Sequence, residues 1–303
     1  MKERPSEVVD VHTCIQPWQM LKPDVLEHLT AGRHDMDRLW QIAEDPREMV
    51  RALDDAGISR AALINYPSPE LMGFTSEVND WVAAYCRAFP NRLIPAGSIH
   101  PRHVGSMAAE FDRLVRDLGL RFLVVHPTHQ EFFPNAYRDD ESYASLEVLY
   151  HKCEQAQIPI MFQTGTSNVP GARWKYGDPL PLDDVAIDFP KLRVILAQGG
   201  RPFWMSQSFY LMRRYPNFYL DISGIPPRKL LEYFPRLEEI GDRTLFGSDW
   251  PSPGVHELER NVDDFCSLPL PADLQAAILG GNALSLFKLG SKKLEAKGAA
   301  ANG

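Results

Sequence analysis

Short apolar runs recur along the chain, and each is followed by a polar residue or by Gly or Pro before a helical stretch begins. Most runs are continuous rather than alternating, which is typical of strands buried on both faces of a parallel sheet. The predicted strands are 8–12, 61–65, 93–99, 122–126, 159–163, 194–198, 218–223 and 244–249. Amphipathic segments predict helices over 46–57, 103–119, 142–156, 204–215, 226–240 and 255–268.

This alternation of strands and helices indicates right-handed βαβ units, and eight of them predict an α/β protein with a single (β/α)8 TIM barrel over residues 1–289. A doubly wound open sheet is the competing fold. It is disfavoured because no glycine-rich phosphate turn follows the first strand. The remaining residues, 290–303, are small and charged, so we expect a disordered C-terminal tail.

Two connecting segments, 18–45 and 165–184, are longer than typical βα loops. Both leave the predicted C-terminal ends of strands, where barrel enzymes build their sites. We therefore expect these segments to form lids or substrate walls.

Composition narrows the function classes. The chain has 303 residues, 44% hydrophobic and 24% charged, which is ordinary for a globular protein and excludes a disordered chain. The 32 basic and 40 acidic residues are interleaved and leave a net charge of −8. No basic stripe stands out, so we expect no nucleic-acid partner.

The four cysteines, Cys14, Cys86, Cys153 and Cys266, are too far apart for a CxxC motif or a disulfide framework. The first residues, MKERPSEVVD, contain no apolar signal region, and no apolar run is long enough to span a membrane. These features predict a soluble, cytoplasmic protein without a membrane partner.

The predicted strands end in polar residues. A barrel brings the carboxyl ends of its strands together, and a lone polar residue there could be a simple cap, but a full set favours a shared site. The residues are His12, Asn65, His100, His126, Gln163, Gln198, Asp221 or Ser223, and Asp249.

Several motifs resemble those of the amidohydrolase-related branch of the amidohydrolase superfamily: VVDVHTC, IPIMFQTGTS, RRYPNFYLDISG, RTLFGSDWP and ILGGNALSLF. This branch contains metal-dependent hydrolases and the non-oxidative decarboxylases related to aminocarboxymuconate-semialdehyde decarboxylase. The resemblance extends from Val8 to about Leu289. It implies a distorted barrel of the metal-dependent-hydrolase type with its site at the C-terminal face, and it suggests a homodimer.

The chain departs from the family's metal-binding pattern. The first-strand motif Asp-x-His-x-His appears as Asp10-Val11-His12-Thr13-Cys14, and glutamines, Gln163 and Gln198, replace the histidines that end the fifth and sixth strands. The ligands left for a divalent metal such as Zn²⁺ are His12, Cys14 and Asp249. Cys14 also reads as a small buried hydrophobe, and carboxamides are poor zinc ligands. We therefore expect no tightly bound metal, and a centre that holds water or a weakly bound ion.

Three residues are the catalytic candidates. Asp249 is expected to act as a general base on water, with His12 or His126 as its partner. His129, three residues beyond His126, reads as a turn residue.

A second group is expected to bind the substrate. The amides of Gln163 and Gln198 could donate hydrogen bonds to a developing oxyanion. Arg201 could clamp a carboxylate or be a solvated loop charge. His100 is a further candidate, and Trp250 could form an aromatic wall for a flat ring or pack under the loops. Arg173 and Lys175 are alternative clamps.

These residues predict a hydrolase that cleaves a lactone, ester or amide bond in a small, anionic, carboxylated substrate. The reaction could be metal-independent, as in the related 2-pyrone-4,6-dicarboxylate lactonase group. One alternative is a metal-dependent carboxy-lyase, a non-oxidative decarboxylase of an aromatic or muconate-type acid, which the lost ligands disfavour. Another is a non-catalytic barrel that binds a ligand or a partner, which the retained His12 and Asp249 disfavour.

Overall fold

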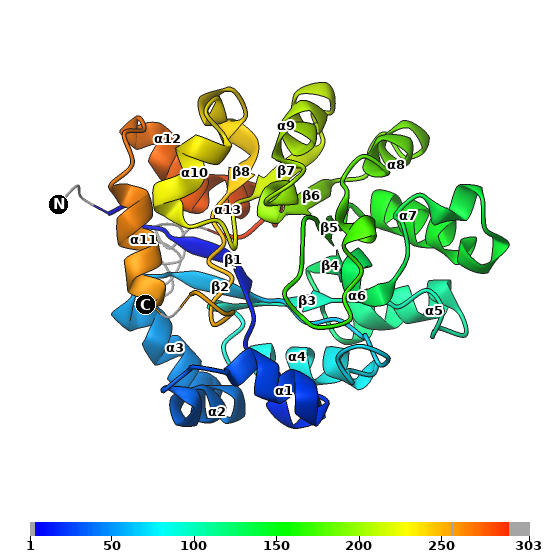
Figure 1. Ribbon diagram of the computed structural model, residues 1–303, viewed down its shortest axis with the longest axis horizontal. Coiled ribbons are helices and arrows are strands. Elements are labelled where there is room, and N and C mark those ends of the chain that lie inside the picture. The colour runs from blue at the N-terminus through cyan, green and yellow to red at the C-terminus, as the bar shows by residue number, and fades with distance from the viewer. Residues whose placement is uncertain (1–3, 256, 291–303) are drawn as a thin grey trace, which may run out of the picture.

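The computed structural model describes residues 4–255 and 257–290, and this part of the chain forms an eight-stranded parallel barrel surrounded by helices (Figure 1). Neighbouring strands pair in sequence order. They are β1 Val9–Thr13, β2 Arg60–Leu63, β3 Leu93–Gly97, β4 Phe122–Val125, β5 Ile160–Gln163, β6 Val194–Ala197, β7 Phe218–Asp221 and β8 Thr244–Leu245. The predicted TIM-barrel fold is confirmed.

The barrel is nearly closed between its first and last strands. The backbone N–H of Val11 donates to the carbonyl of Phe246 at 2.9 Å, and that of Cys14 donates to the carbonyl of Trp250 at 2.7 Å. Of the strand predicted over 244–249, β8 covers only Thr244 and Leu245, but the chain that follows still lies against β1 through these bonds.

The helices form the outer layer. They are α1 Pro23–Thr30, α2 Met36–Glu44, α3 Pro46–Asp55, α4 Glu77–Arg87, α5 Met107–Asp112, α6 Pro127–Gln130, α7 Ser145–Ala156, α8 Leu182–Asp188, α9 Met205–Arg214, α10 Leu230–Tyr233, α11 Leu258–Cys266, α12 Ala272–Ala276 and α13 Asn282–Leu286. The predicted helix over 226–240 is wrong as a single element. Pro235 follows α10, and its ring and missing N–H prevent the helix from continuing.

Two apolar cores explain the continuous hydrophobic runs. Inside the barrel, Val9, Met161 and Ile195 pack with the last helix, whose neighbour Phe287 contacts the Phe122 ring with centroids 4.9 Å apart. Outside it, alternate strand residues such as Phe162 pack against the helices. Because both faces of each strand are buried, polar residues occur mainly where the strands end.

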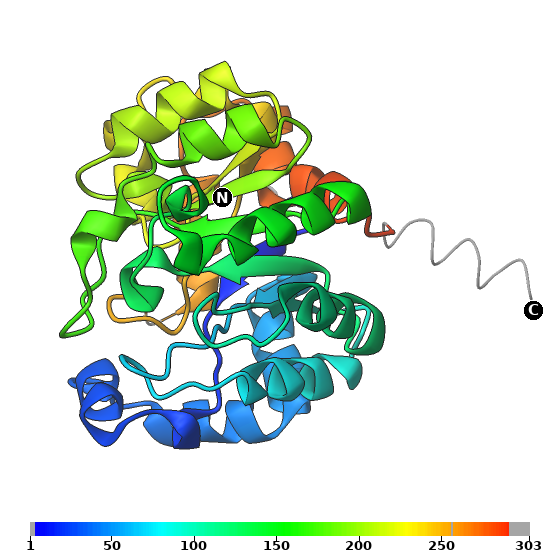
Figure 2. The ribbon, with the colours of Figure 1, turned by 90° about the vertical axis from the view of Figure 1, so that its right-hand side faces the viewer.

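The two long segments project from one end of the barrel. Figure 2 shows the blue helices α1 and α2 and the green segment after β5 on the same side of the molecule, while the red α13 lies on the opposite side. The expectation that 18–45 and 165–184 lie over the C-terminal face is therefore confirmed.

No helix within 4–255 and 257–290 combines the length and apolar character that crossing a bilayer requires. The tail predicted over 290–303 lies, from residue 291 onward, outside the described residues.

Candidate active site

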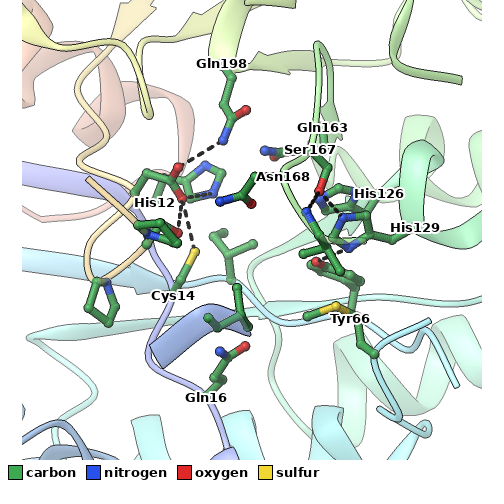
Figure 3. A pocket seen from close by; sticks show the side chains of 18 of the residues that line it. His12, Cys14, Gln16, Tyr66, His126, His129, Gln163, Ser167, Asn168 and Gln198 are labelled. Carbon is green, nitrogen blue, oxygen red and sulfur yellow. Dashed lines mark hydrogen bonds and ion pairs between the residues drawn. The ribbon is translucent and has the colours of Figure 1, made fainter. Parts of the chain in front are cut away.

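A cavity of about 340 Å³ opens where the strands end, and it collects most of the predicted site residues. Strand ends contribute His12, Cys14, His126, Gln163, Gln198, Arg201 and Asp249, and the two long segments contribute Trp18, Arg33, Met36, Ser167, Asn168 and Trp174. Figure 3 shows His12 and Cys14 on one side of the cavity, and Tyr66, His126 and His129 on the other. The prediction that His12, Gln163, Gln198 and Asp249 share one cavity is confirmed.

His12 is oriented by a buried carboxylate. Its Nδ1 lies 2.7 Å from Oδ2 of Asp221 and 3.0 Å from the hydroxyl of Ser223. Burial alone would lower the pKa of His12, but the negative charge and hydrogen bond of Asp221 outweigh burial and raise this pKa well above its usual value. With Nδ1 committed to Asp221, Nε2 lies 3.7 Å from Oδ1 of Asp249.

Asp249 is held by three side chains. Its Oδ1 accepts hydrogen bonds from Ser252 Oγ at 2.9 Å and Cys14 Sγ at 3.4 Å, and its Oδ2 accepts one from Gln198 Nε2 at 3.0 Å. Burial raises the pKa of Asp249 against the opposing attraction of His12. A fixed carboxylate with a raised pKa is a better proton acceptor than an ordinary carboxylate.

The donor set His12, Cys14 and Asp249 fits a divalent metal ion. One ligand atom of each lies within 4.8 Å of the others, and Oδ1 of Asp249 lies 3.7 Å from the imidazole nitrogen and 3.4 Å from the sulfur. Zinc bond lengths in a tetrahedral site require separations of roughly 3.3–3.5 Å between such atoms. Asp221 orients His12 as outer carboxylates orient metal-binding histidines in proteins.

The opposite wall contains two neutral histidines. The rings of His126 and His129 stack with centroids 3.7 Å apart, and burial lowers the pKa of His126 well below its usual value and that of His129 to about 3. His129 Nδ1 pairs with the Tyr66 hydroxyl at 2.8 Å, and its Nε2 pairs with the Ser167 hydroxyl at 2.7 Å. This wall is polar but uncharged at neutral pH.

Reading His129 as a turn residue was therefore incomplete, because the residue is buried and lines the cavity. It lies on the one-turn helix α6, three positions after His126, and residues at this spacing share a helix face. That spacing, with Pro127 at the start of the helix, was the signal in the sequence.

The cavity also contains a guanidinium group without a partner. Within the described residues, Arg201 makes no ion pair, and its buried Nε has no hydrogen-bond partner. The other arginine of the cavity, Arg33, is paired with Asp35 and the carbonyl of Pro251. Gln163 lines the cavity with a buried Oε1 that also has no partner in the described chain.

Two predicted substrate-binding residues lie elsewhere. His100 is three residues beyond the end of β3, where the chain has turned away, and it lines a separate hollow, in which burial lowers its pKa to about 4. Trp250, which follows Asp249, packs in the outer core and does not line the cavity. Neither is placed to bind a ligand in this cavity.

The alternative clamps and Asn65 have structural roles. Arg173 pairs with Glu131, and Lys175 lies over the Tyr176 ring. The Asn65 amide donates to the carbonyl of Ile15 at 2.9 Å. Arg201 is therefore the cation available to a substrate among these candidates.

Comparison with solved structures shows the same fold in other proteins. An uncharacterised TIM-barrel protein from Bordetella bronchiseptica is 24% identical, with a TM-score of 0.69 over 93% of this chain and 99% of that chain. The 5-carboxyvanillate decarboxylase from Sphingomonas paucimobilis is 17% identical, with a TM-score of 0.65 over 94% and 100%. The same enzyme from Novosphingobium aromaticivorans, complexed with manganese and 4-hydroxy-3-methoxy-5-nitrobenzoic acid, is 17% identical, with a TM-score of 0.64 over 95% and 97%.

Sequence comparison adds the family. No curated protein matches the chain significantly. A model of the amidohydrolase family matches residues 18–289, which includes every strand after β1 and both long segments. The chain belongs to the amidohydrolase family.

Proposed function

We propose that this protein hydrolyses an ester, lactone or amide bond in a small carboxylated substrate, with Asp249 as the group that transfers the proton. The observation that supports this most directly is the placement of Asp249. Its carboxylate is buried, its pKa is raised, and both its oxygens are held by donors at the end of a cavity that also contains Arg201, which makes no ion pair within the described residues.

Arg201 supports the choice of an anionic substrate. A guanidinium group with a buried, unpartnered Nε is ready to bind a carboxylate through paired hydrogen bonds. The cavity volume of about 340 Å³ suits a single ring or a short chain. The neutral wall of His126 and His129 adds no competing charge.

The proton follows a simple path. As water attacks the carbonyl carbon, Asp249 accepts one proton from it, and the same proton passes to the leaving oxygen or nitrogen when the bond from the carbonyl carbon breaks. Gln198 uses one N–H to hold Oδ2 of Asp249 and has a second N–H available. This second N–H and the amide of Gln163 can donate to the oxygen that becomes negative.

His12, Cys14 and Asp249 are the residues that would hold a divalent ion. When bound, the ion would act as a Lewis acid that polarises the substrate's oxygen. The role of Asp221 would then be to keep the Nε2 lone pair of His12 directed at the ligand position. That the protein binds no metal tightly stays a prediction, and metal analysis of the purified protein tests it.

Decarboxylation is the second candidate function, and the fold shared with the 5-carboxyvanillate decarboxylases favours it. In this reaction the bond between carbon and the carboxylate breaks, carbon dioxide leaves, and the carbon accepts a proton. Asp249 in its protonated form, which burial favours, would supply that proton. Both reactions thus need the same carboxyl group in opposite protonation states.

A panel assay on the purified full chain distinguishes the two functions. Hydrolysis of carboxylated lactones and aryl esters is assayed by proton release, hydrolysis of amides by release of the amine, and decarboxylation of aromatic carboxylic acids by release of carbon dioxide, each with and without added Zn²⁺ or Mn²⁺. We expect turnover in the first group that Asp249→Asn abolishes and Ser252→Ala only reduces. Carbon dioxide release alone would support the second function. Binding of carboxylates without turnover in either group would support a non-catalytic barrel and contradict both.

A further inference from the structure

A second hollow, of about 440 Å³, lies between the loops that follow β2 and β3, outside the active-site cavity. It is lined by His100, His103, Ser98, Thr75 and Glu110, none of which lines the cavity that contains Asp249. None of the residues that take part in the proposed reaction lines this hollow.

Glu70, His100 and His103 form a cluster at the edge of the hollow. Each offers a ligand atom, and these atoms all lie within 4.8 Å of one another. His103 Nε2 is 2.6 Å from Oε1 of Glu70, and the rings of His103 and His100 meet edge to face with centroids 4.4 Å apart. Glu70 and His103 are exposed, whereas His100 is buried.

His100 carries the observation that points to a ligand. Only 2% of its surface is exposed, and its buried Nε2 has no hydrogen-bond partner among the described residues. Buried polar atoms of native proteins nearly always have a partner, and those without one need an explanation. The other ring nitrogen, Nδ1, accepts only a long 3.3 Å bond from the backbone N–H of Arg102. Coordination through Nε2 would place the ring proton on Nδ1 and give up this weak bond.

We propose that Glu70, His100 and His103 form a zinc site. Two imidazoles and one carboxylate are a known zinc donor set, in which a further position is left for water. The exposure of Glu70 and His103 leaves such a position open to solvent. The cluster has no thiolate, which distinguishes it from His12, Cys14 and Asp249.

An ion at this site would stiffen one wall of the active-site cavity. It would join the loop after β2, through Glu70, to the loop after β3, through His100 and His103. The loop after β2 also contributes Tyr66 and Met72 to the cavity, and its Ser68 hydroxyl donates to the carbonyl of His129 at 3.0 Å. The zinc site itself does not depend on the reaction proposed above.

The test measures metal binding to the full chain, purified without a histidine tag and stripped of metal. Zinc stoichiometry and affinity are measured by calorimetry, and Co²⁺ is used as a spectroscopic probe. The test variants are Glu70→Gln and His103→Ala, because both residues are exposed and their replacement should leave the fold intact. The matched control is His151→Ala, an exposed histidine on α7 that belongs to neither cluster.

We expect the wild type and His151→Ala each to bind one zinc ion. The Cys14→Ala variant should still bind this ion, and the Co²⁺-loaded wild type should show no thiolate charge-transfer band from this site. Glu70→Gln and His103→Ala should each weaken this binding by well over about 10-fold, since losing only an outer partner of a metal site costs 10–100-fold. Added zinc should raise the midpoint temperature of thermal unfolding of the wild type but not of the two variants. Zinc binding that is unchanged in both variants, or that disappears entirely in Cys14→Ala, would overturn the proposal.

Discussion

The side-chain amide of Gln198 donates a hydrogen bond to Oδ2 of Asp249 at 3.0 Å, and both residues have left-handed backbones, with φ of 58° and 65°. Residues other than glycine seldom adopt this conformation, which costs roughly 1–2 kcal/mol per residue. Two such residues in contact at the strand ends indicate strain that the surrounding fold maintains, and such strain clusters at functional sites.

Replacing Gln198 separates this backbone strain from the role of its side chain. Both Gln198→Gly and Gln198→Ala remove the bond to Asp249, but only glycine relaxes a positive φ. We therefore expect the glycine variant to be more stable than the alanine variant by about 1 kcal/mol, measured by urea denaturation. Both should lose catalytic activity to a similar degree. Equal stability of the two variants would show that the strain is absent.

Asp221→Asn should impair the site formed by His12, Cys14 and Asp249, in activity or in metal affinity, without unfolding the barrel. The change keeps the shape of the side chain but removes the charge that raises the pKa of His12, so NMR titration should show this pKa falling. We expect activity or metal affinity to fall by about 10–100-fold. Asp188→Asn, which alters an exposed carboxylate paired with Arg138, is the control and should behave as the wild type. A His12 pKa that does not move would refute the assigned role of Asp221.

Arg201 should determine the preference for carboxylated substrates. Arg201→Gln is expected to raise KM for a carboxylated substrate by about 10- to 100-fold, because a hydrogen bond to a charged group contributes roughly 1.5–3 kcal/mol. The KM for the corresponding neutral substrate should hardly change. Arg173→Gln is the matched control, since Arg173 is a loop arginine already paired with Glu131. If both substrates lose affinity equally in Arg201→Gln, the carboxylate clamp is wrong.

Stability should fall in mild acid because of His129. Its pKa is about 3 in the folded protein, so below an unfolded-state pKa of about 6.5 the unfolded chain binds a proton that the folded chain does not. The stabilisation from neutral His129 is fully present above the unfolded-state pKa. It decreases as the pH falls from there toward 3, by about 1.4 kcal/mol per pH unit for a single histidine.

The comparison of wild type with His129→Gln isolates this effect. Between about pH 7.5 and about pH 5, the free energy of unfolding should decrease by about 2 kcal/mol less in the variant than in the wild type. The variant loses the hydrogen bonds to Tyr66 and Ser167 at every pH. For this reason only the pH dependence of the free energy of unfolding, and not its absolute value, is informative. If urea denaturation shows that the free energy of unfolding changes equally between the two pH values in the wild type and the variant, a neutral, buried His129 is contradicted.

The sequence by itself determined the barrel. Its continuous apolar runs and intervening amphipathic stretches are local patterns, and strands buried on both faces leave few other folds for eight such units. The residues that follow the runs were predictable for the same reason. His12, Gln163, Gln198 and Asp249 meet because parallel strands all end at one face.

The exceptions among the helices also have local causes. Pro235 divides the stretch over 226–240 after α10, a break that the sequence signals directly. The predicted position of His100 was wrong, because the residue lies three positions beyond the end of β3 and lines the separate hollow instead of the active-site cavity.

Only the tertiary structure decided which polar groups are partners. Asp221 meets His12 across 209 residues, and Tyr66 and Ser167 meet His129 from two different loops. A strand's pattern gives the direction of its own side chains. Whether a hydrogen bond forms depends on differences of a few tenths of an ångström in the distance between atoms of elements that are far apart in the sequence. Arg201 and Arg33 look alike in the sequence, and only the folded chain shows that Arg33 pairs with a carboxylate whereas Arg201 pairs with none in the part of the chain that the structure describes.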